Sequence, residues 1–331
     1  MNFLYFLESI RNPVLDFLMG TVTFIGGETL FLVIAILLIW CADKRTGYFT
    51  LLCCFFGTVI NQALKLIFKI PRPWVKDPGF TIVESARAEA TGYSFPSGHT
   101  QNVSCTFGAL ATVNPKRWKW IACLSVIALV AFSRMYLGVH TPLDVGVSLL
   151  IGAALVFGLR YLFLTEERFV KVMPYVIVAS YLLTTALLCF TFLVPEEGID
   201  PHNLESARKN ACTLHGSTIA LFFVWFLDRR YIQYPTTGRW YAQIAMVTVG
   251  FGIVLLIKSV MQTPLEWIFL GNPWIARTVR YFLIVIFAGT VWPLTFRFWS
   301  TLRSERLDRF GERVVSVFKR KSVKAEDDTE C

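Results

Sequence analysis

Long apolar stretches recur along the whole chain and constrain its fold more than any other feature. A helix that crosses a bilayer needs roughly 20 mostly apolar residues, because the hydrocarbon core offers no water to satisfy free backbone groups. We therefore expect an all-α integral membrane protein, a multi-span helical bundle with about nine transmembrane helices, two of them short. The expected spans are residues 21–40, 49–68, 98–113, 118–137, 143–163, 172–194, 212–227, 240–257 and 279–299.

Composition supports a membrane protein and excludes an ordinary soluble domain. Of the 331 residues, 55% are hydrophobic and 17% charged, and the mean hydropathy is +0.54. The net charge of +9 would suit nucleic acid, but the basic residues lie in short connections between spans and near the C-terminal end. Membrane orientation explains that distribution better. We expect membrane lipids as partners and no nucleic acid, and the sequence leaves the oligomeric state open.

Lysine and arginine gather in alternate connections, which predicts the orientation of the bundle. Connections rich in these residues face the cytoplasm, so we expect the N-terminus outside and the C-terminus cytoplasmic. The connection between the second and third spans is an exception, because it is also basic and yet falls on the outer side. A bound anion would explain this misplaced positive charge. The basic clusters that set the orientation lie at residues 44–45, 116–119, 160–171, 229–239 and 297–324.

Four regions follow from this pattern. Residues 1–20 mix aromatic and charged side chains, as in an amphipathic helix that lies in the interface or packs on the bundle. Residues 21–170 contain the polar motifs described below, and residues 171–300 add further transmembrane helices without a motif. Residues 301–331 form a basic cytoplasmic tail, expected to include a membrane-surface helix.

The first polar motif is K-L-I-F-K-I-P-R-P, residues 65–73. Lys65 lies near the end of a predicted span, and Pro71 and Pro73 end the helix and hold Arg72 in an extended conformation. Two cations are then placed to bind a phosphate. Alternatively, both are ordinary helix-end residues whose charged groups reach the membrane surface.

The second motif is F-P-S-G-H-T, residues 95–100. Ser97 can cap the helix that follows, and Gly98 allows a ligand to approach the backbone closely. The free amides of the first helical turn would then form an anion site, with His99 beside it as a proton donor. The alternative is a plain turn with an interfacial histidine.

The third motif is S-R-M-Y-L-G-V-H-T-P-L-D, residues 133–144. Thr141 fits a helix N-cap with a proline at the first helical position, which places Asp144 at the third position, beside His140. An imidazole held by a carboxylate at one nitrogen presents the other as a nucleophile or base. Arg134 adds a planar cation suited to an oxyanion. Taken alone, the segment also fits an interfacial histidine ring and a simple capping aspartate.

Together, Lys65-x6-Arg72-Pro73, Pro96-Ser97-Gly98-His99 and Ser133-Arg134-x5-His140-x3-Asp144 resemble the three signature motifs of the type 2 phosphatidic acid phosphatase superfamily. That superfamily also contains vanadium haloperoxidases and glucose-6-phosphatase. The resemblance is complete at every motif position and covers residues 65–144, extending to residue 163 by span count. A haloperoxidase is not expected, since those members are soluble.

The resemblance implies a role for each motif residue. His140 would attack phosphorus to form a phosphohistidine, Asp144 would orient it, and His99 would protonate the leaving alcohol and then activate water. No metal and no cofactor are implied, because cations and amides would stabilise the phosphoryl group. Ser133 also matches a motif position, where the resemblance leaves its role open and the structural alternative is that it shapes the turn. The residues implied to bind the phosphoryl oxygens are Lys65, Arg72, Ser97, Gly98 and Arg134.

We therefore expect a membrane phosphatase for a lipid phosphate or diphosphate, with its site on the extracytoplasmic side. An isoprenyl phosphate, phosphatidate or phosphatidylglycerol phosphate would each fit, and we expect a bacterial plasma (inner) membrane location. The span count instead resembles glucose-6-phosphatase, which leaves a sugar phosphatase open, as well as phosphoryl transfer to an acceptor other than water. A transporter or lipid-binding protein that keeps an anion site without catalysis is the alternative from another class.

Overall fold

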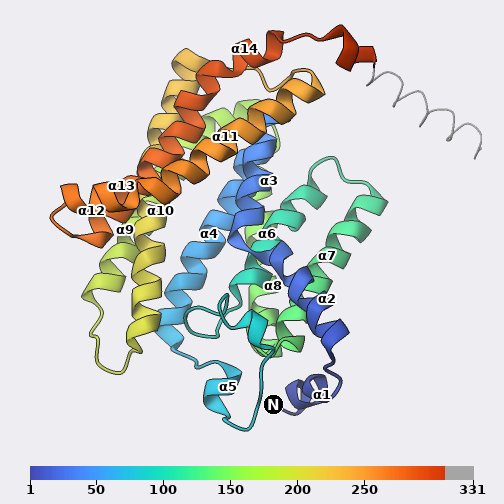
Figure 1. Cartoon of the computed structure of the whole chain (residues 1–331), viewed down its shortest axis with the longest axis vertical. Helices are drawn as coiled ribbons and strands as arrows, with labels where there is room; N and C mark the ends of the chain where they lie inside the picture. Colours follow the sequence, from blue (N-terminus) through green and yellow to red (C-terminus); the bar gives the residue numbers. More distant parts are fainter. Residues whose placement is uncertain (310–331) are drawn as a thin grey trace, which may run out of the picture.

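The structure, a computed structural model, describes residues 1–309, and all of its regular secondary structure there is helical (Figure 1). This confirms the expected all-α class. The longer helices are α2 (Pro13–Thr23), α3 (Glu28–Cys41), α4 (Lys44–Phe68), α6 (Gly98–Thr112), α7 (Arg117–Tyr136), α8 (Pro142–Arg160), α9 (Glu166–Leu193), α10 (Pro201–Leu227), α11 (Trp240–Val260) and α13 (Pro273–Ile286). Shorter ones are α1 (Asn2–Ser9), α5 (Pro73–Lys76), α12 (Gln262–Ile268) and α14 (Phe296–Thr301). Single turns are η1 (Phe24–Gly26), η2 (Glu84–Ala86), η3 (Tyr161–Phe163), η4 (Asp228–Ile232), η5 (Phe287–Val291) and η6 (Trp292–Thr295).

The number of membrane spans differs from the expected nine. Among residues 1–309, seven helical stretches are long and apolar enough to cross a membrane, or eight if a pair bent by 46° is one span. The bent pair consists of the helical stretches 13–26 and 28–41. Between them, Gly27 has an extended backbone, interrupts the predicted span and is the N-cap residue of α3. The other expected span that is missing from this count is α6, because its 15 residues are too few to be counted as a membrane span. Nine spans are therefore not confirmed.

The ends of the chain also depart from the expected regions. The segment 1–20 is not one helix, because the chain breaks after α1 and restarts at α2. Asn12 caps α2 through its side chain, and Pro13 occupies the first helical position, where no amide hydrogen is needed. The expected boundaries at residues 20 and 170 fall inside α2 and α9. In the predicted tail, residues 305–309 are helical, and residues 310–331 lie outside the described residues.

Helix α10 starts much earlier than its apolar run suggests. The expected span began at residue 212, whereas α10 begins at Pro201, where Asp200 accepts a hydrogen bond from the Asn203 amide as N-cap. The mixed, partly acidic stretch before residue 212 is thus mostly helix. Capping and proline at the first position outweigh its polarity.

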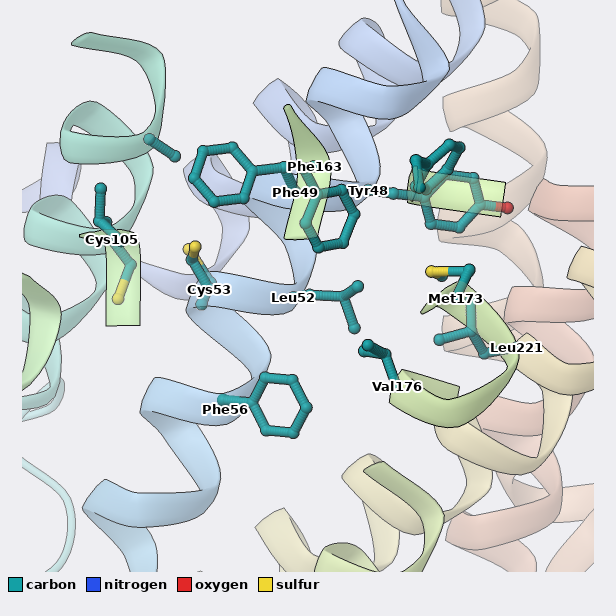
Figure 2. Close-up of a cluster of buried hydrophobic side chains, with 14 of the residues drawn as sticks. Tyr48, Phe49, Leu52, Cys53, Phe56, Cys105, Phe163, Met173, Val176 and Leu221 are labelled. Atoms are coloured by element: carbon teal, nitrogen blue, oxygen red, sulfur yellow. The ribbon is translucent and has the colours of Figure 1, made fainter. Parts of the chain in front are cut away.

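Helix α4 is the centre of the bundle. It contacts α3, α6, α8, α9 and α10. Figure 2 shows its apolar face, with Tyr48, Leu52 and Phe56 directed toward Met173, Val176 and Leu221 of α9 and α10, while Cys53 faces Cys105 of α6. Because α4 ends at the first motif, this core fixes where the motif lies.

A second packing unit joins α10 to α13. The two helices approach so closely that a side chain at Gly216 would bring its Cβ into a clash with the Thr278 carbonyl oxygen.

Trp40, Trp292 and Phe296 form a separate buried cluster at the α14 end of the molecule. The connection that contains α5 lies at the opposite end, near α1 (Figure 1).

Candidate active site

Arg72 connects the first motif to the third. It has the expected extended backbone between two prolines, and its side chain is 5% exposed. The guanidinium donates to the carbonyl oxygens of Val139, Thr91 and Gly92 at 2.8–3.1 Å. Its Nη1 also lies 3.0 Å from Nε2 of His140. Because arginine only donates, Nε2 is the acceptor in this contact.

Lys65 occupies the last turn of α4 and is equally buried, at 8% exposure. Its ammonium nitrogen lies 3.4 Å from the Thr91 carbonyl oxygen, which Arg72 also binds. The two cations of the first motif therefore converge on one backbone oxygen. The end of the connection 76–93 thus lines the site through Thr91.

Ser97 and Gly98 form the helix start that the sequence predicts. Ser97 caps α6 by accepting from the Thr100 amide, and its own amide donates to the Asp144 carbonyl oxygen at 3.2 Å. The first amides of α6 have no partner within the helix. A Cβ at Gly98 would meet only Asn61 Oδ1, at 3.9 Å, so the glycine leaves open space beside these amides. That space suits an anion.

His140 and Asp144 lie side by side, as predicted, and both are 1% exposed. Thr141 and Asp144 form a reciprocal capping box at the start of α8. His140 Nδ1 is 3.5 Å from Asp144 Oδ2, an ion-pair separation longer than an ordinary hydrogen bond. Since Arg72 donates to Nε2, the neutral ring carries its proton on Nδ1, toward Asp144.

Burial lowers the pKa of His140 well below its usual value. The Arg72 and Arg134 cations lower it further, against the opposing effect of Asp144. The imidazole is therefore neutral near pH 7 and has a lone pair on Nε2. This is the form that a nucleophile or a general base requires.

Arg134 is fully buried in the last turn of α7. Its Nη1 donates to the Thr23 hydroxyl at 2.7 Å, whereas Nε and Nη2 have no hydrogen-bond partner among residues 1–309. Ser133, by contrast, donates to the Val130 carbonyl oxygen within its own helix. Arg134 thus presents two unused donors in the interior of the protein.

His99 follows the α6 N-terminus and is partly exposed. Its ring forms no hydrogen bond within residues 1–309, and it lies within electrostatic range of Arg134, His140 and Lys65. The η1 turn packs directly against it, since a Cβ at Gly26 would lie 2.8 Å from the His99 carbonyl oxygen. All eight expected site residues therefore gather at one end of the bundle.

Two sequence models of known families match the chain. The model of the PAP2 superfamily matches residues 46–168, which include all three motifs. The model of the transmembrane extension of PAP2 superfamily phosphatases matches residues 212–304. The chain belongs to the PAP2 superfamily. Its extension corresponds to most of α10 together with α11, α12, α13 and α14.

Curated relatives agree with the PAP2 assignment. An undecaprenyl-diphosphatase of Sulfolobus acidocaldarius is 33% identical over 114 residues, which is 34% of this chain and 53% of that protein. Phosphatidylglycerophosphatase B of Bacillus subtilis is 29% identical over 150 residues, or 41% of this chain and 69% of that protein. Lipid phosphate phosphatase delta of Arabidopsis thaliana is 26% identical over 151 residues, which is 42% of this chain and 36% of that protein. The match thus spans about half of the length of the Sulfolobus protein. No solved structure matches the chain.

The structure adds residues to the PAP2 site that the sequence did not indicate. Thr23 and Gly26 come from outside the stretch that the PAP2 model matches, and they contact Arg134 and His99. Ser94 donates to Asp144, and Asn61 donates to the Pro96 carbonyl oxygen. The only available signal was the closeness of Ser94 to the second motif, three residues before Ser97.

Proposed function

We propose that this protein hydrolyses a lipid phosphate or diphosphate through a phosphohistidine intermediate. The observation that supports this most strongly is Arg134, a fully buried cation with two donor nitrogens that have no partner in the described part of the chain. Lys65 and Arg72 are buried close by, so the buried positive charge of these three side chains exceeds the negative charge of the buried Asp144 carboxylate beside them. A buried charge without a partner is costly, and a phosphoryl group would compensate it.

The proposed reaction has two steps. In the first, Nε2 of His140 attacks phosphorus as Arg72 turns from Nε2 to a phosphoryl oxygen. The bond from phosphorus to the alcohol oxygen breaks, and protonated His99 gives its proton to that oxygen. In the second, His99 takes a proton from water, whose oxygen attacks phosphorus and breaks the bond to His140. Phosphate leaves, and both histidines return to their starting forms.

Side chains and amides supply the positive charge for this reaction. Lys65, Arg72 and Arg134, with the amides beside Gly98, would stabilise the charge that develops on the phosphoryl oxygens. Asp144 would stabilise the imidazolium of His140 during attack. We therefore propose a reaction without a metal or cofactor and expect it to continue in the presence of a chelator.

The relatives support a lipid as substrate. Their names specify undecaprenyl diphosphate, phosphatidylglycerol phosphate and lipid phosphates as substrates of those proteins. In this chain the motifs lie at the ends of apolar helices, where an apolar tail could stay in the bilayer while its head group enters the site. We propose an isoprenyl phosphate or diphosphate, phosphatidate or phosphatidylglycerol phosphate.

We also propose that the site faces the extracytoplasmic side of a bacterial plasma membrane. The basic connections that predict the cytoplasmic face contact one another at the end opposite the motifs; for example, Arg45 donates to the Leu164 carbonyl oxygen. If the bent pair and α6 both cross, the chain has nine spans, with the N-terminus outside. Helix α6 is about 22 Å long, and it can be short and polar because α4, α7 and α8 surround it.

The test is phosphate release by the protein purified in detergent. Isoprenyl phosphates, phosphatidate, phosphatidylglycerol phosphate and glucose 6-phosphate are compared, with and without chelator. We expect release from a lipid, unaffected by chelator, abolished in His140→Ala and retained in His202→Ala, which changes an exposed histidine. Release by His140→Ala at the normal rate would disprove the mechanism.

Other outcomes of the same assay would replace the proposal. Release from glucose 6-phosphate alone would favour the sugar phosphatase. A phosphorylated acceptor among the products would show transfer in place of hydrolysis. Absence of release from every substrate, with uptake of the phosphorylated compound into liposomes, would favour transport.

A further inference from the structure

Ser94 connects all three motifs although it belongs to none of them. It is fully buried, and its amide donates to the Ile70 carbonyl oxygen at 2.9 Å, two residues before Arg72. Its hydroxyl donates to Asp144 Oδ2 at 2.6 Å. Three residues later the chain reaches Ser97. Through Asp144, Ser94 is therefore linked to His140.

The hydroxyl of Ser94 limits how Asp144 can bind His140. Asp144 Oδ2 accepts one hydrogen bond from Ser94 and a second from the Thr141 amide at 2.7 Å. A carboxylate oxygen has two lone pairs in its plane, so these two donors use both. His140 Nδ1 remains 3.5 Å away from the same oxygen and has no hydrogen bond to any of the residues that the structure describes.

We propose that Ser94 is a positioning residue that keeps Asp144 from closing on His140, and so keeps Nε2 of His140 directed at the phosphate site. The inference rests on the proposed function for its effect on catalysis. Its structural part, the restraint on the Asp144–His140 pair, is independent of any reaction.

Removing the hydroxyl has a defined consequence. In Ser94→Ala, one lone pair of Asp144 Oδ2 is freed, and the carboxylate can move to hydrogen-bond distance from Nδ1. The ring then turns toward Asp144, which moves Nε2 away from the phosphate site. The closer carboxylate also stabilises the protonated imidazole, which raises the pKa of His140.

The other charged groups around His140 stay in place in this variant. Arg72 contacts Nε2 from the segment after α4, and Arg134 approaches from α7. His99 of α6 and Lys65 of α4 lie in the same group of interacting charges. A change in the titration of His140 in Ser94→Ala therefore reports on the Asp144 contact.

The first experiment measures the His140 titration directly, without turnover. The protein is labelled with ¹³C-histidine and purified in detergent, and the four histidine ring signals are followed by NMR against pH; the signal lost in His140→Gln identifies His140. We expect Ser94→Ala to raise the pKa of His140 by about one unit. Ser180→Ala is the matched control, because Ser180 is equally buried but donates only to the Val176 carbonyl oxygen.

The second experiment measures turnover of a lipid phosphate against pH. We expect kcat of Ser94→Ala to fall by about ten- to a hundredfold, since a small displacement of a reacting group has effects of this size. The acid limb of kcat/KM should move to higher pH. Ser94→Thr, which keeps the hydroxyl, should restore the acid limb. Ser94→Cys, similar in size but a weak donor, should be intermediate and replaces Ser94→Ala if that variant does not fold.

The outcomes separate this inference from the proposed function. An unchanged His140 titration in both Ser94→Ala and Ser94→Cys would overturn the inference, whatever the activity. A uniform loss of kcat at all pH values, without a shifted acid limb, would reduce Ser94 to a structural residue and also overturn it. If the unaltered protein releases no phosphate, the proposed function fails, and the NMR titration still decides whether Ser94 restrains Asp144.

Discussion

Arg134 shows how one buried side chain can specify the charge of a ligand. Its position in the last turn of α7 places the guanidinium in the interior, and Thr23 satisfies only one of its nitrogens. Under the proposed function, lysine would not replace it, because a single ammonium group lacks the planar pair of donors that would bind two phosphoryl oxygens. The proposed requirement for arginine follows from the geometry of the Nε–Nη2 edge, which has no hydrogen-bond partner within residues 1–309.

This requirement gives a first prediction. Arg134→Lys should lower kcat/KM by about 10²- to 10³-fold, the usual effect of losing a donor to an oxyanion. Steady-state kinetics on a lipid phosphate measures it, and Arg230→Lys, at an exposed arginine of η4, serves as control. Equal activity of both variants would show that Arg134 does not bind the substrate.

The pKa of His140 gives a second prediction at this scale. Because burial lowers that pKa below its usual value of 6.5, the neutral ring persists to lower pH than in a free histidine. The acid limb of kcat/KM reports the free enzyme, so it should fall only below pH 6.5. A profile that already falls between pH 8 and pH 7 would contradict the buried, neutral nucleophile.

At the scale of elements, the break between α2 and α3 forms one wall of the site. The η1 turn brings Gly26 against His99 and Val130, with Cβ distances of 2.8 Å to the His99 carbonyl oxygen and the Val130 side chain. The Asn102 side chain also donates to the Gly26 carbonyl oxygen, which fixes the turn on α6. The bend is therefore a close fit between two elements.

That fit predicts the effect of one methyl group. Gly26→Ala should displace η1 or the start of α6 and lower kcat by about tenfold or more, since backbone atoms cannot yield as a flexible side chain does. Gly158→Ala is the control, because a Cβ there meets nothing within 4 Å. Normal kinetics in Gly26→Ala would show that His99 tolerates the displacement.

A partly buried ion pair links the start of α4 to the residue after α10. The Lys44 ammonium contacts both Asp228 oxygens at 2.8–2.9 Å and lies 3.4 Å from the centre of the Tyr234 ring. Removing Asp228 leaves the partly buried Lys44 ammonium without its carboxylate partner, which is costly. The pair lies at the end opposite the motifs, so it bears on stability and not on chemistry.

Asp228→Asn should therefore lower the free energy of unfolding by about 1–3 kcal/mol, with kcat unchanged. Thermal unfolding in detergent measures the loss. Glu166→Gln, which breaks an exposed ion pair with Arg229, should change the free energy of unfolding little. An unaltered melting temperature in Asp228→Asn would show that the pair is not stabilising.

At the scale of the whole molecule, the three motifs and the basic connections that predict the cytoplasmic face lie at opposite ends of the bundle. The motifs gather at the α5 end, and the α14 end holds the basic connections (Figure 1). If the basic end is cytoplasmic, the site opens to the outside.

Orientation is testable with single cysteines in a cysteine-free chain. In intact cells, a membrane-impermeant thiol reagent should label Glu197→Cys, which precedes α10 at the motif end. It should not label Lys116→Cys, which precedes α7 at the other end; both positions are exposed. The reverse pattern would place the active site in the cytoplasm.

Much of this architecture could be predicted from the sequence, because its causes are local. Runs of apolar residues specify membrane helices wherever they occur. Proline on both sides of Arg72 and the cap formed by Thr141 and Asp144 act over a few residues, and the structure has both as expected. The sequence by itself therefore determined the fold class, the helix starts at two motifs and the pairing of His140 with Asp144.

Only the tertiary structure decided how the site is completed. Ser94 meets Asp144 across 50 residues, and Thr23 meets Arg134 across 111, so no local pattern signals either contact. The bend at Gly27 and the short α6 depend on packing against neighbouring helices, which hydropathy does not encode. Spans and caps follow from nearby residues, whereas the contacts that hold Asp144 and Arg134 come from side chains that folding alone brings together.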